Sequence, residues 1–226
     1  MKYALPILLL AISHGGFCGL TKAQESRDDG GSTKEVSEQL VFKTDWRGER
    51  IELPPEFAPD MGWNGIEEIR FAPGMFDPKS DSFFTYVFVF SLPGDQKLTQ
   101  EAVKKETLIY YRGLAKSVLK SKGKEVDASK FTFALEKAKA ASGTPATVKA
   151  PADVTQYSGK LDWVEPFATA EPQILHFEIQ QWRDAKTKRD YLFVCTSPRA
   201  IADADAIWKE LRKVRSDFEV KVVPVE

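Results

Sequence analysis

The fold is decided by the run Asp81-Ser82-Phe83-Phe84-Thr85-Tyr86-Val87-Phe88-Val89-Phe90-Ser91-Leu92. Successive side chains of a β-strand point to opposite faces, and both faces of this run are largely apolar. Its β-branched and aromatic residues favour a strand, and its length disfavours a buried helix. Pro93-Gly94-Asp95 then supplies turn residues. We therefore predict a central strand over residues 81–92 that is covered on both faces.

The clearest helix follows this strand. Thr99 is the expected N-cap and Gly123 the expected stop, and lysines crowd the C-terminal end, as the helix dipole favours. Gly113 costs about 1 kcal/mol relative to Ala inside a helix, which a close contact between this helix and the aromatic strand would explain. If the C-terminal helix covers the other face of the strand, the core is solid. Otherwise the face that carries Phe84 and Phe90 lines a cavity.

The rest of the chain predicts hairpins. Arg47-Gly48-Glu49 is expected to turn an opening hairpin, and a last helix is expected from near Ser197-Pro198 or Asp203. Further strands are expected at residues 51–53, 67–71, 131–137, 157–167, 175–180 and 191–196, with 146–150 and the tail 220–226 as additional short pairings. The predicted class is α+β. It has a mostly antiparallel sheet of about six to eight strands with two main helices packed on it, like an α/β/α sandwich.

Composition is that of an ordinary globular protein. The 226 residues are 42% hydrophobic and 29% charged, and the formal net charge is −1. This balance gives no argument for a nucleic acid or an anionic membrane as partner. No run beyond the N-terminus is long and apolar enough to predict a transmembrane segment.

The N-terminus has the pattern of a secretory signal peptide over residues 1–23. Lys2 is followed by a short apolar run, and Thr21-Lys22-Ala23 gives an acceptable cleavage site. We therefore expect an exported protein, periplasmic or extracellular. Cys18 offers an alternative, a lipid anchor, although Phe17 is larger than the residue that a lipoprotein signal requires there. Residues 24–38 predict a flexible polar linker, and residues 39–226 a single α+β domain.

After removal of residues 1–23, the chain contains one cysteine, Cys195, and one histidine, His176. One cysteine cannot form a disulfide within the chain, and one Cys with one His cannot complete a zinc site. No motif implies a metal or another cofactor. Cys195 and His176 on opposing strands would suggest a thiol–imidazole nucleophile, but a free cysteine is usually a small buried hydrophobe. We predict no catalytic residue, and the sequence favours a protein that is not an enzyme.

Residues 54–81 predict a long loop with large apolar side chains. One interpretation is a ligand- or partner-binding surface that uses Trp63, Arg70 and Phe76. The other is a loop whose aromatic side chains pack on the core.

Two segments near the ends of the chain share a pattern with a known family. They are Glu49-Arg50-Ile51-Glu52-Leu53-Pro54 and, at the other end, Tyr191-Leu192-Phe193-Val194 with Trp208 and Ser216-Asp217-Phe218-Glu219-Val220. They resemble the opening strand, and the last strand and helix, of PsbP-like domains. Residues 54–81 do not match that pattern. The family is mostly non-catalytic, so the resemblance implies an α/β/α fold and an accessory or scaffolding role.

Three functions stay open. The first is an exported, non-catalytic binding or accessory domain for an unknown protein or small apolar ligand. The second is a carrier of a lipid or other apolar ligand, in a cavity lined by the aromatic face of the 81–92 strand. The third is a hydrolase whose site draws on scattered acids, namely Asp60, Asp77, Asp81 or Glu165. The oligomeric state cannot be inferred from the sequence.

Overall fold

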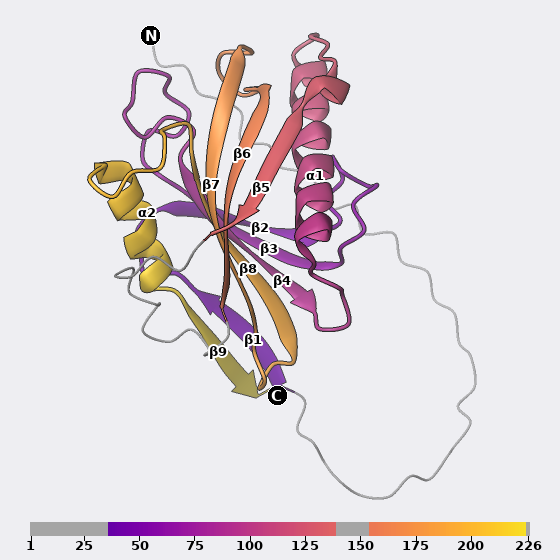
Figure 1. Ribbon diagram of the computed structural model, residues 1–226, viewed down its shortest axis with the longest axis vertical. Helices are drawn as coiled ribbons and strands as arrows, with labels where there is room; N and C mark the ends of the chain where they lie inside the picture. The colour runs from indigo at the N-terminus through magenta and orange to yellow at the C-terminus, as the bar shows by residue number, and fades with distance from the viewer. Residues whose placement is uncertain (1–35, 139–153, 225–226) are drawn as a thin grey trace, which may run out of the picture. The chain divides into compact units, whose positions relative to one another are not determined.

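An antiparallel sheet of seven strands forms the centre of the computed structural model, which describes residues 36–138 and 154–224 (Figure 1). The predicted signal peptide, the linker up to residue 35 and the pairing at 146–150 lie outside the described residues. In spatial order the sheet is β2-β3-β4-β8-β7-β6-β5. Its strands are β2 (Arg47–Leu53), β3 (Gly65–Phe71), β4 (Tyr86–Pro93), β5 (Thr132–Lys137), β6 (Thr155–Val164), β7 (Pro172–Arg183) and β8 (Arg189–Ser197).

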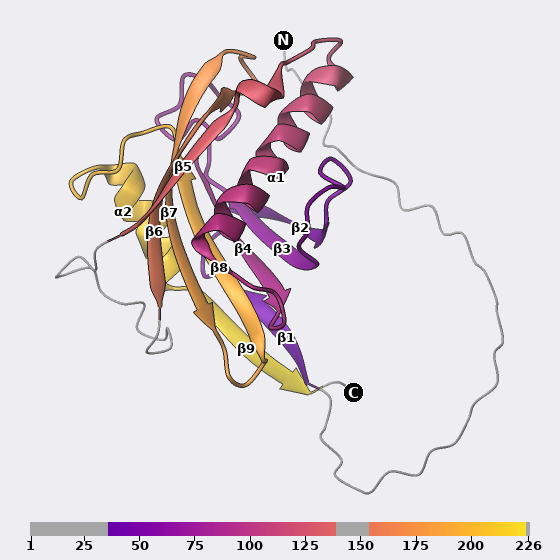
Figure 2. The same ribbon diagram turned by 45° about the vertical axis from the view of Figure 1, so that its right-hand side comes forward.

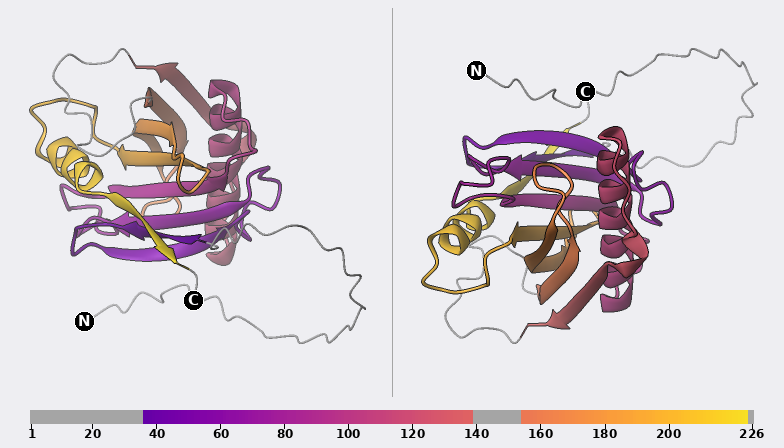
Figure 3. Two further views of the ribbon diagram at one scale, coloured as in Figure 1. Left: turned by 90° about the horizontal axis from the view of Figure 1, so that it is seen from below. Right: turned by 90° about the horizontal axis from the view of Figure 1, so that it is seen from above.

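Two helices and a second, two-stranded sheet pack on this sheet. The helices are α1 (Gln100–Ser121) and α2 (Ala206–Ser216), with a short 3-10 turn, η1 (Ala128–Lys130), after α1. The second sheet pairs β1 (Val36–Val41) with β9 (Glu219–Pro224). Figure 3 shows α1 and α2 on opposite sides of the seven-stranded sheet. The predicted α+β class and its antiparallel sheet with two main helices are confirmed.

Strand β4 is an interior strand between β3 and β8, and every residue from Tyr86 to Leu92 is buried. It begins at Tyr86, five residues later than predicted. The preceding residues form turns, with Ser80 O accepting from Phe83 N, and Phe84 has a φ of +49° that a strand does not allow. The Phe84 ring nevertheless packs on Tyr86 with centroids 5.6 Å apart, so it continues the aromatic face.

Helix α1 covers the aromatic face of β4 (Figure 2). Its predicted start is confirmed, because the Thr99 hydroxyl accepts from Ala102 N at 3.1 Å, and Gly123 ends it with a φ of +67°. The Tyr110 ring stacks on Phe88 at 6.4 Å between centroids, and the Tyr111 hydroxyl bonds that of Tyr86 at 2.6 Å. Side chains of the helix therefore fill the space where the carrier hypothesis places a cavity.

Helix α2 covers the opposite face of β4. Val87 and Val89 are fully buried in one cluster with Trp208 and Leu211 of this helix, and β1 and β9 add Leu40 and Val220 to it. The helix begins at Ala206, later than either predicted start, because the Asp205 carboxylate caps it by accepting from Ile207 N and Trp208 N. The strand is thus covered on both faces, as predicted.

The reason why a glycine occupies position 113 differs from the one predicted. A Cβ at this position would collide with the carbonyl oxygen of Phe57 and approach Ala58. The close neighbour of α1 is therefore the loop that follows β2, and not the aromatic strand. Glu106 fixes the same loop to the helix, because its carboxylate accepts from Gly62 N at 2.7 Å.

The predicted opening hairpin is wrong. Residues 47–53 form one continuous strand, β2, whose partner is β3, while β1 pairs with β9 at the far end of the chain. Gly48 does not turn; it lies under the side chain of Arg70, which a Cβ there would displace. The domain also starts before residue 39, because β1 begins at Val36 and the Glu38 carboxylate accepts from Arg189 Nε at 2.9 Å.

Candidate functional site

Trp63 belongs to the core and does not reach the surface. Only 4% of it is exposed, and its ring packs edge-on against Phe90 with centroids 5.8 Å apart. Its neighbours Met61 and Met75 are equally buried. Most of the large apolar side chains at 54–81 therefore pack on the core, as the second interpretation of that loop expects.

Arg70 lies on the other face of the sheet from Trp63. Its register partner is Val87, which packs with α2, and its guanidinium lies 4.5 Å from the centre of the Phe42 ring. It also donates to the Glu68 carboxylate at 3.1 Å. A guanidinium held by both a carboxylate and an aromatic ring is committed to internal contacts. The structure therefore does not bring Arg70 together with Trp63 and Phe76.

Phe76 is the member of the predicted trio that faces solvent, with 43% of its surface exposed. Its ring contacts Phe71 at the end of β3 and Phe167 in the β6–β7 loop, each at 5.8 Å between centroids. We call Phe71, Phe76 and Phe167 the aromatic patch. Sequence analysis named Phe76 but missed Phe167, which lies about 90 residues further along the chain.

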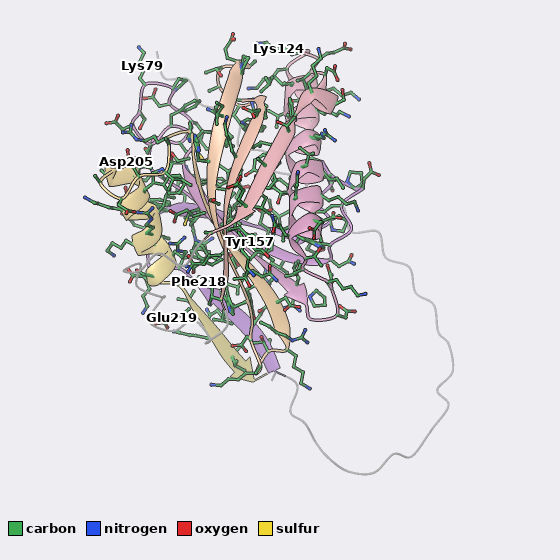
Figure 4. All side chains as sticks on the ribbon, in the orientation of Figure 1. Lys79, Lys124, Tyr157, Asp205, Phe218 and Glu219 are labelled. Carbon is green, nitrogen blue, oxygen red and sulfur yellow. The ribbon has the colours of Figure 1, made fainter. Side chains whose placement is uncertain are left out.

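The loops that carry the aromatic patch are braced by hydrogen bonds. Phe84 N donates to Met75 O at 2.8 Å, and Lys122 Nζ at the end of α1 donates to Pro166 O at 2.9 Å. The fully buried Glu165 carboxylate accepts from Ala168 N at 3.0 Å and Thr169 N at 2.7 Å. Figure 4 places Lys79 of one loop and Lys124, just beyond α1, at the same end of the domain.

The acids named for a hydrolase are not arranged as a catalytic pair. Glu165 is fully buried and its oxygens accept from the backbone of its own turn. Asp77 accepts from Lys79 N at 2.9 Å and caps a turn, while Asp60 and Asp81 are exposed. Each of the bonded carboxylates has a local structural role.

Cys195 is a buried structural residue. It is fully buried, and its thiol donates to Leu211 O over 3.6 Å. Burial raises the pKa of this thiol to about 12, so the nucleophilic thiolate is not formed at neutral pH. The register pairs His176 with Ser197, and the residue opposite Cys195 is Glu178. The geometry does not support a thiol–imidazole nucleophile.

A buried carboxyl group that sequence analysis missed lies beneath α1. Glu67 of β3 is fully buried, and the Tyr110 hydroxyl donates to both of its oxygens at 3.1 Å. Burial raises the pKa of Glu67 to about 8, and the charge of Glu49 on β2 adds to the rise. The sequence does contain an indication that Glu67 is buried, because strand alternation puts it on the same face as the apolar Ile69 and Phe71.

A second charged cluster joins α2 to β7. The Glu178 carboxylate accepts from Arg212 Nη2 at 2.6 Å and from Arg215 Nη1 at 3.0 Å. A pocket of about 180 Å³ opens beside this cluster. The sequence spacing of the two arginines put them on one helix face, but nothing local indicated which strand that face would meet.

The described residues contain neither a cluster of metal-ligating side chains nor a membrane-spanning helix. Within residues 36–138 and 154–224, no three His, Cys, Asp or Glu side chains gather as a metal site would require. Neither described helix combines the length and apolarity needed to cross a bilayer. Comparisons with protein-family models, curated proteins and solved structures found no match to this chain.

Proposed function

We propose that this chain is an exported, non-catalytic accessory domain that binds a partner protein through the aromatic patch. The observation that carries the proposal is the exposure of Phe76 on a loop that hydrogen bonds hold in place. Large aromatic side chains at the centre of a contact supply much of the binding energy in protein interfaces. A braced loop also loses little conformational entropy on binding.

Phe76 differs from the other exposed apolar side chains of the described residues. Ile174 and Val222 are 41% and 39% exposed, about as much as Phe76. Both lie on strands and neither has a ring contact, whereas Phe76 contacts the half-buried rings of Phe71 and Phe167. A single exposed aliphatic residue is ordinary, but an exposed aromatic ring beside two half-buried rings extends the apolar surface, which favours an interaction there.

A photo-crosslinking experiment tests this proposal. A photoreactive phenylalanine analogue replaces Phe76 in the full chain, expressed in its own cell envelope or medium. The matched variant carries the same analogue at Ile174, which is equally exposed but lies on β7. We expect a discrete crosslinked protein from position 76 only. Crosslinks that are equal at both positions, or absent at position 76, would overturn the proposal.

The two alternatives have less support. The carrier hypothesis needs space against the β4 aromatic face, and α1 occupies that face with Tyr110 and Tyr111. The hydrolase hypothesis needs converging acids, and two of the acids it names, Asp77 and Glu165, bond the backbone of their own turns. The resemblance to PsbP-like domains agrees in kind with an accessory role but stays a prediction.

Export is part of the proposal and has its own test. Intact mass spectrometry of the protein recovered from outside the cytoplasm should give a chain that begins at Gln24. A mass that begins at Cys18 and includes acyl chains would replace the signal-peptide prediction with a lipid anchor. A full-length chain in the cytoplasm would contradict both.

A further inference from the structure

The pocket beside α2 is walled by the helix on one side and by the sheet on the other. Arg212 and Arg215 line it from α2, while Glu178 and Gln180 line it from β7 and Gln156 from β6. Figure 4 labels the neighbouring Tyr157 of β6 near the middle of the domain. Its volume of about 180 Å³ holds at least about six water molecules, at about 30 Å³ each. The pocket is therefore large enough for a small organic molecule.

Arg215 is a buried cation with unused donors. Its residue is 5% exposed, and its Nη1 donates to Glu178 at 3.0 Å. Its Nε and Nη2 form no hydrogen bond with any described residue. These two N–H groups lie on one edge of the guanidinium plane, where a carboxylate binds through both of its oxygens.

Gln180 is a buried amide in the wall of the same pocket. It is 3% exposed, and its side chain has no hydrogen-bond partner within the described part of the chain. It faces Gln156 across the β6–β7 register. Its polar atoms are not fully enclosed, so the amide opens to the pocket, where water or a ligand can supply its partner. The amide therefore marks a polar contact point in the pocket.

The buried charges around the pocket leave an excess of one positive charge. Two guanidiniums share the single Glu178 carboxylate. Asp203 also pairs with Arg212 at 2.9 Å, but its side chain is fully exposed, so water and salt screen its charge. A monoanion would balance the buried part of the cluster without displacing the existing ion pairs.

We propose that this pocket is a binding site for a small organic carboxylate that also carries an amide or hydroxyl group. The carboxylate accepts from Nε and Nη2 of Arg215, and the polar group bonds the Gln180 amide. This site is separate from the aromatic patch, and the proposal does not depend on the partner-binding function. The chemistry of the two contacts sets the ligand class, and the volume limits its size.

Nuclear magnetic resonance titration of the full chain tests the site, with N-acetylglycine as the carboxylate probe. We expect saturable shifts of the Arg215 Nε–H and Gln180 Nε2–H₂ signals below about 20 mM ligand. Inorganic phosphate, an oxyanion without the amide, should shift Arg215 more weakly and leave Gln180 unmoved. If phosphate binds and N-acetylglycine does not, the site is a phosphate site and the carboxylate proposal fails.

Two variants and a control localise the binding. Gln180→Met removes the amide at similar volume, and Arg215→Lys keeps the charge but loses the two-donor edge. Each should weaken N-acetylglycine binding at least about tenfold. Gln173→Met, on the opposite face of β7 where Gln173 bonds Trp163, should not change it. If Arg215→Lys fails to fold, Gln180→Met alone decides. Unchanged affinity in Gln180→Met, or no shift in the unmodified protein, would overturn the proposal.

Discussion

Replacing Glu67 with Gln should remove most of the pH dependence that this carboxyl group imposes on the free energy of unfolding. Glu67 is fully buried, and among the described residues it has no ion-pair partner. Its contact is the Tyr110 hydroxyl, which donates to it at 3.1 Å. A carboxylate in such a place is costly to ionise, whereas the amide of Gln has a similar shape and carries no charge at any of these pH values.

The size of the effect follows from the two pKa values of this carboxyl group. It has a pKa of 4.5 in the unfolded chain and about 8 in the fold, chiefly because of burial. Between these values the folded state binds one more proton, so the free energy of unfolding falls as pH rises, by about 1.4 kcal/mol per pH unit. By pH 7 the loss reaches at most about 3.5 kcal/mol. Above pH 8 Glu67 is ionised in both the folded and the unfolded state, so its contribution to the free energy of unfolding stops changing.

Urea unfolding at pH 5, 6, 7 and 8 measures this directly. The stability of Glu67→Gln minus that of the unmodified protein should increase across the series. Glu52→Gln, at an exposed position on β2, serves as the control and should show a flat difference. Tyr110→Phe removes the hydrogen bond that lowers the pKa of Glu67, so it should extend the loss of stability to higher pH. A constant difference between Glu67→Gln and the unmodified protein from pH 5 to 8 would refute the reasoning.

Three further results are expected. Gly113→Ala should lower the unfolding temperature despite the better helix propensity of Ala, because its Cβ collides with Phe57 O at a cost of about 1–3 kcal/mol. The control Ser117→Ala, on the exposed side of α1, should leave the unfolding temperature nearly unchanged. Equal unfolding temperatures for the two variants would contradict the contact between Gly113 and Phe57. Cys195, with its pKa raised to about 12 by burial, should resist a thiol-specific reagent in the native protein at pH 8 and react fully in urea; rapid native labelling would show that the thiol is accessible. Thr99→Ala should cost about 1 kcal/mol in urea unfolding because it removes the α1 N-cap, and Thr99→Ser should restore most of that loss.

Local patterns predicted the local parts of the fold. The limits of α1 follow from Thr99 and Gly123, whose capping geometry depends on residues close in sequence. The inward positions of β5 and β7 follow from alternation, and Phe133 and Phe177 are both buried. The doubly apolar run correctly indicated an interior strand, because covering both faces is the only way to bury both sets of side chains.

The errors concern contacts between distant segments. Nothing near Arg47 indicates that its strand pairs with β3, or that β1 pairs with β9 from the other end of the chain. The candidate surface failed in part for the same reason. Arg70 and Phe76 are close in sequence, but strand alternation put Arg70 against Phe42 on the far face. The pocket lies where side chains of α2 meet those of β7, which is a tertiary contact without a local signature.

The pairing of β1 with β9 (Figure 1) sets the order in which the chain can finish folding. Val36 aligns with Pro224, so the two strands come from opposite ends of the described sequence. Of the strands in residues 36–138 and 154–224, β1 is synthesised first and β9 last, so β1 has no partner until β9 has emerged. Until then the Val87 and Val89 side of the sheet lacks the cover of both α2 and the β1–β9 pair. Closing a loop of this length is slow compared with local pairing, so that apolar face stays uncovered until α2 and β9 have emerged and docked.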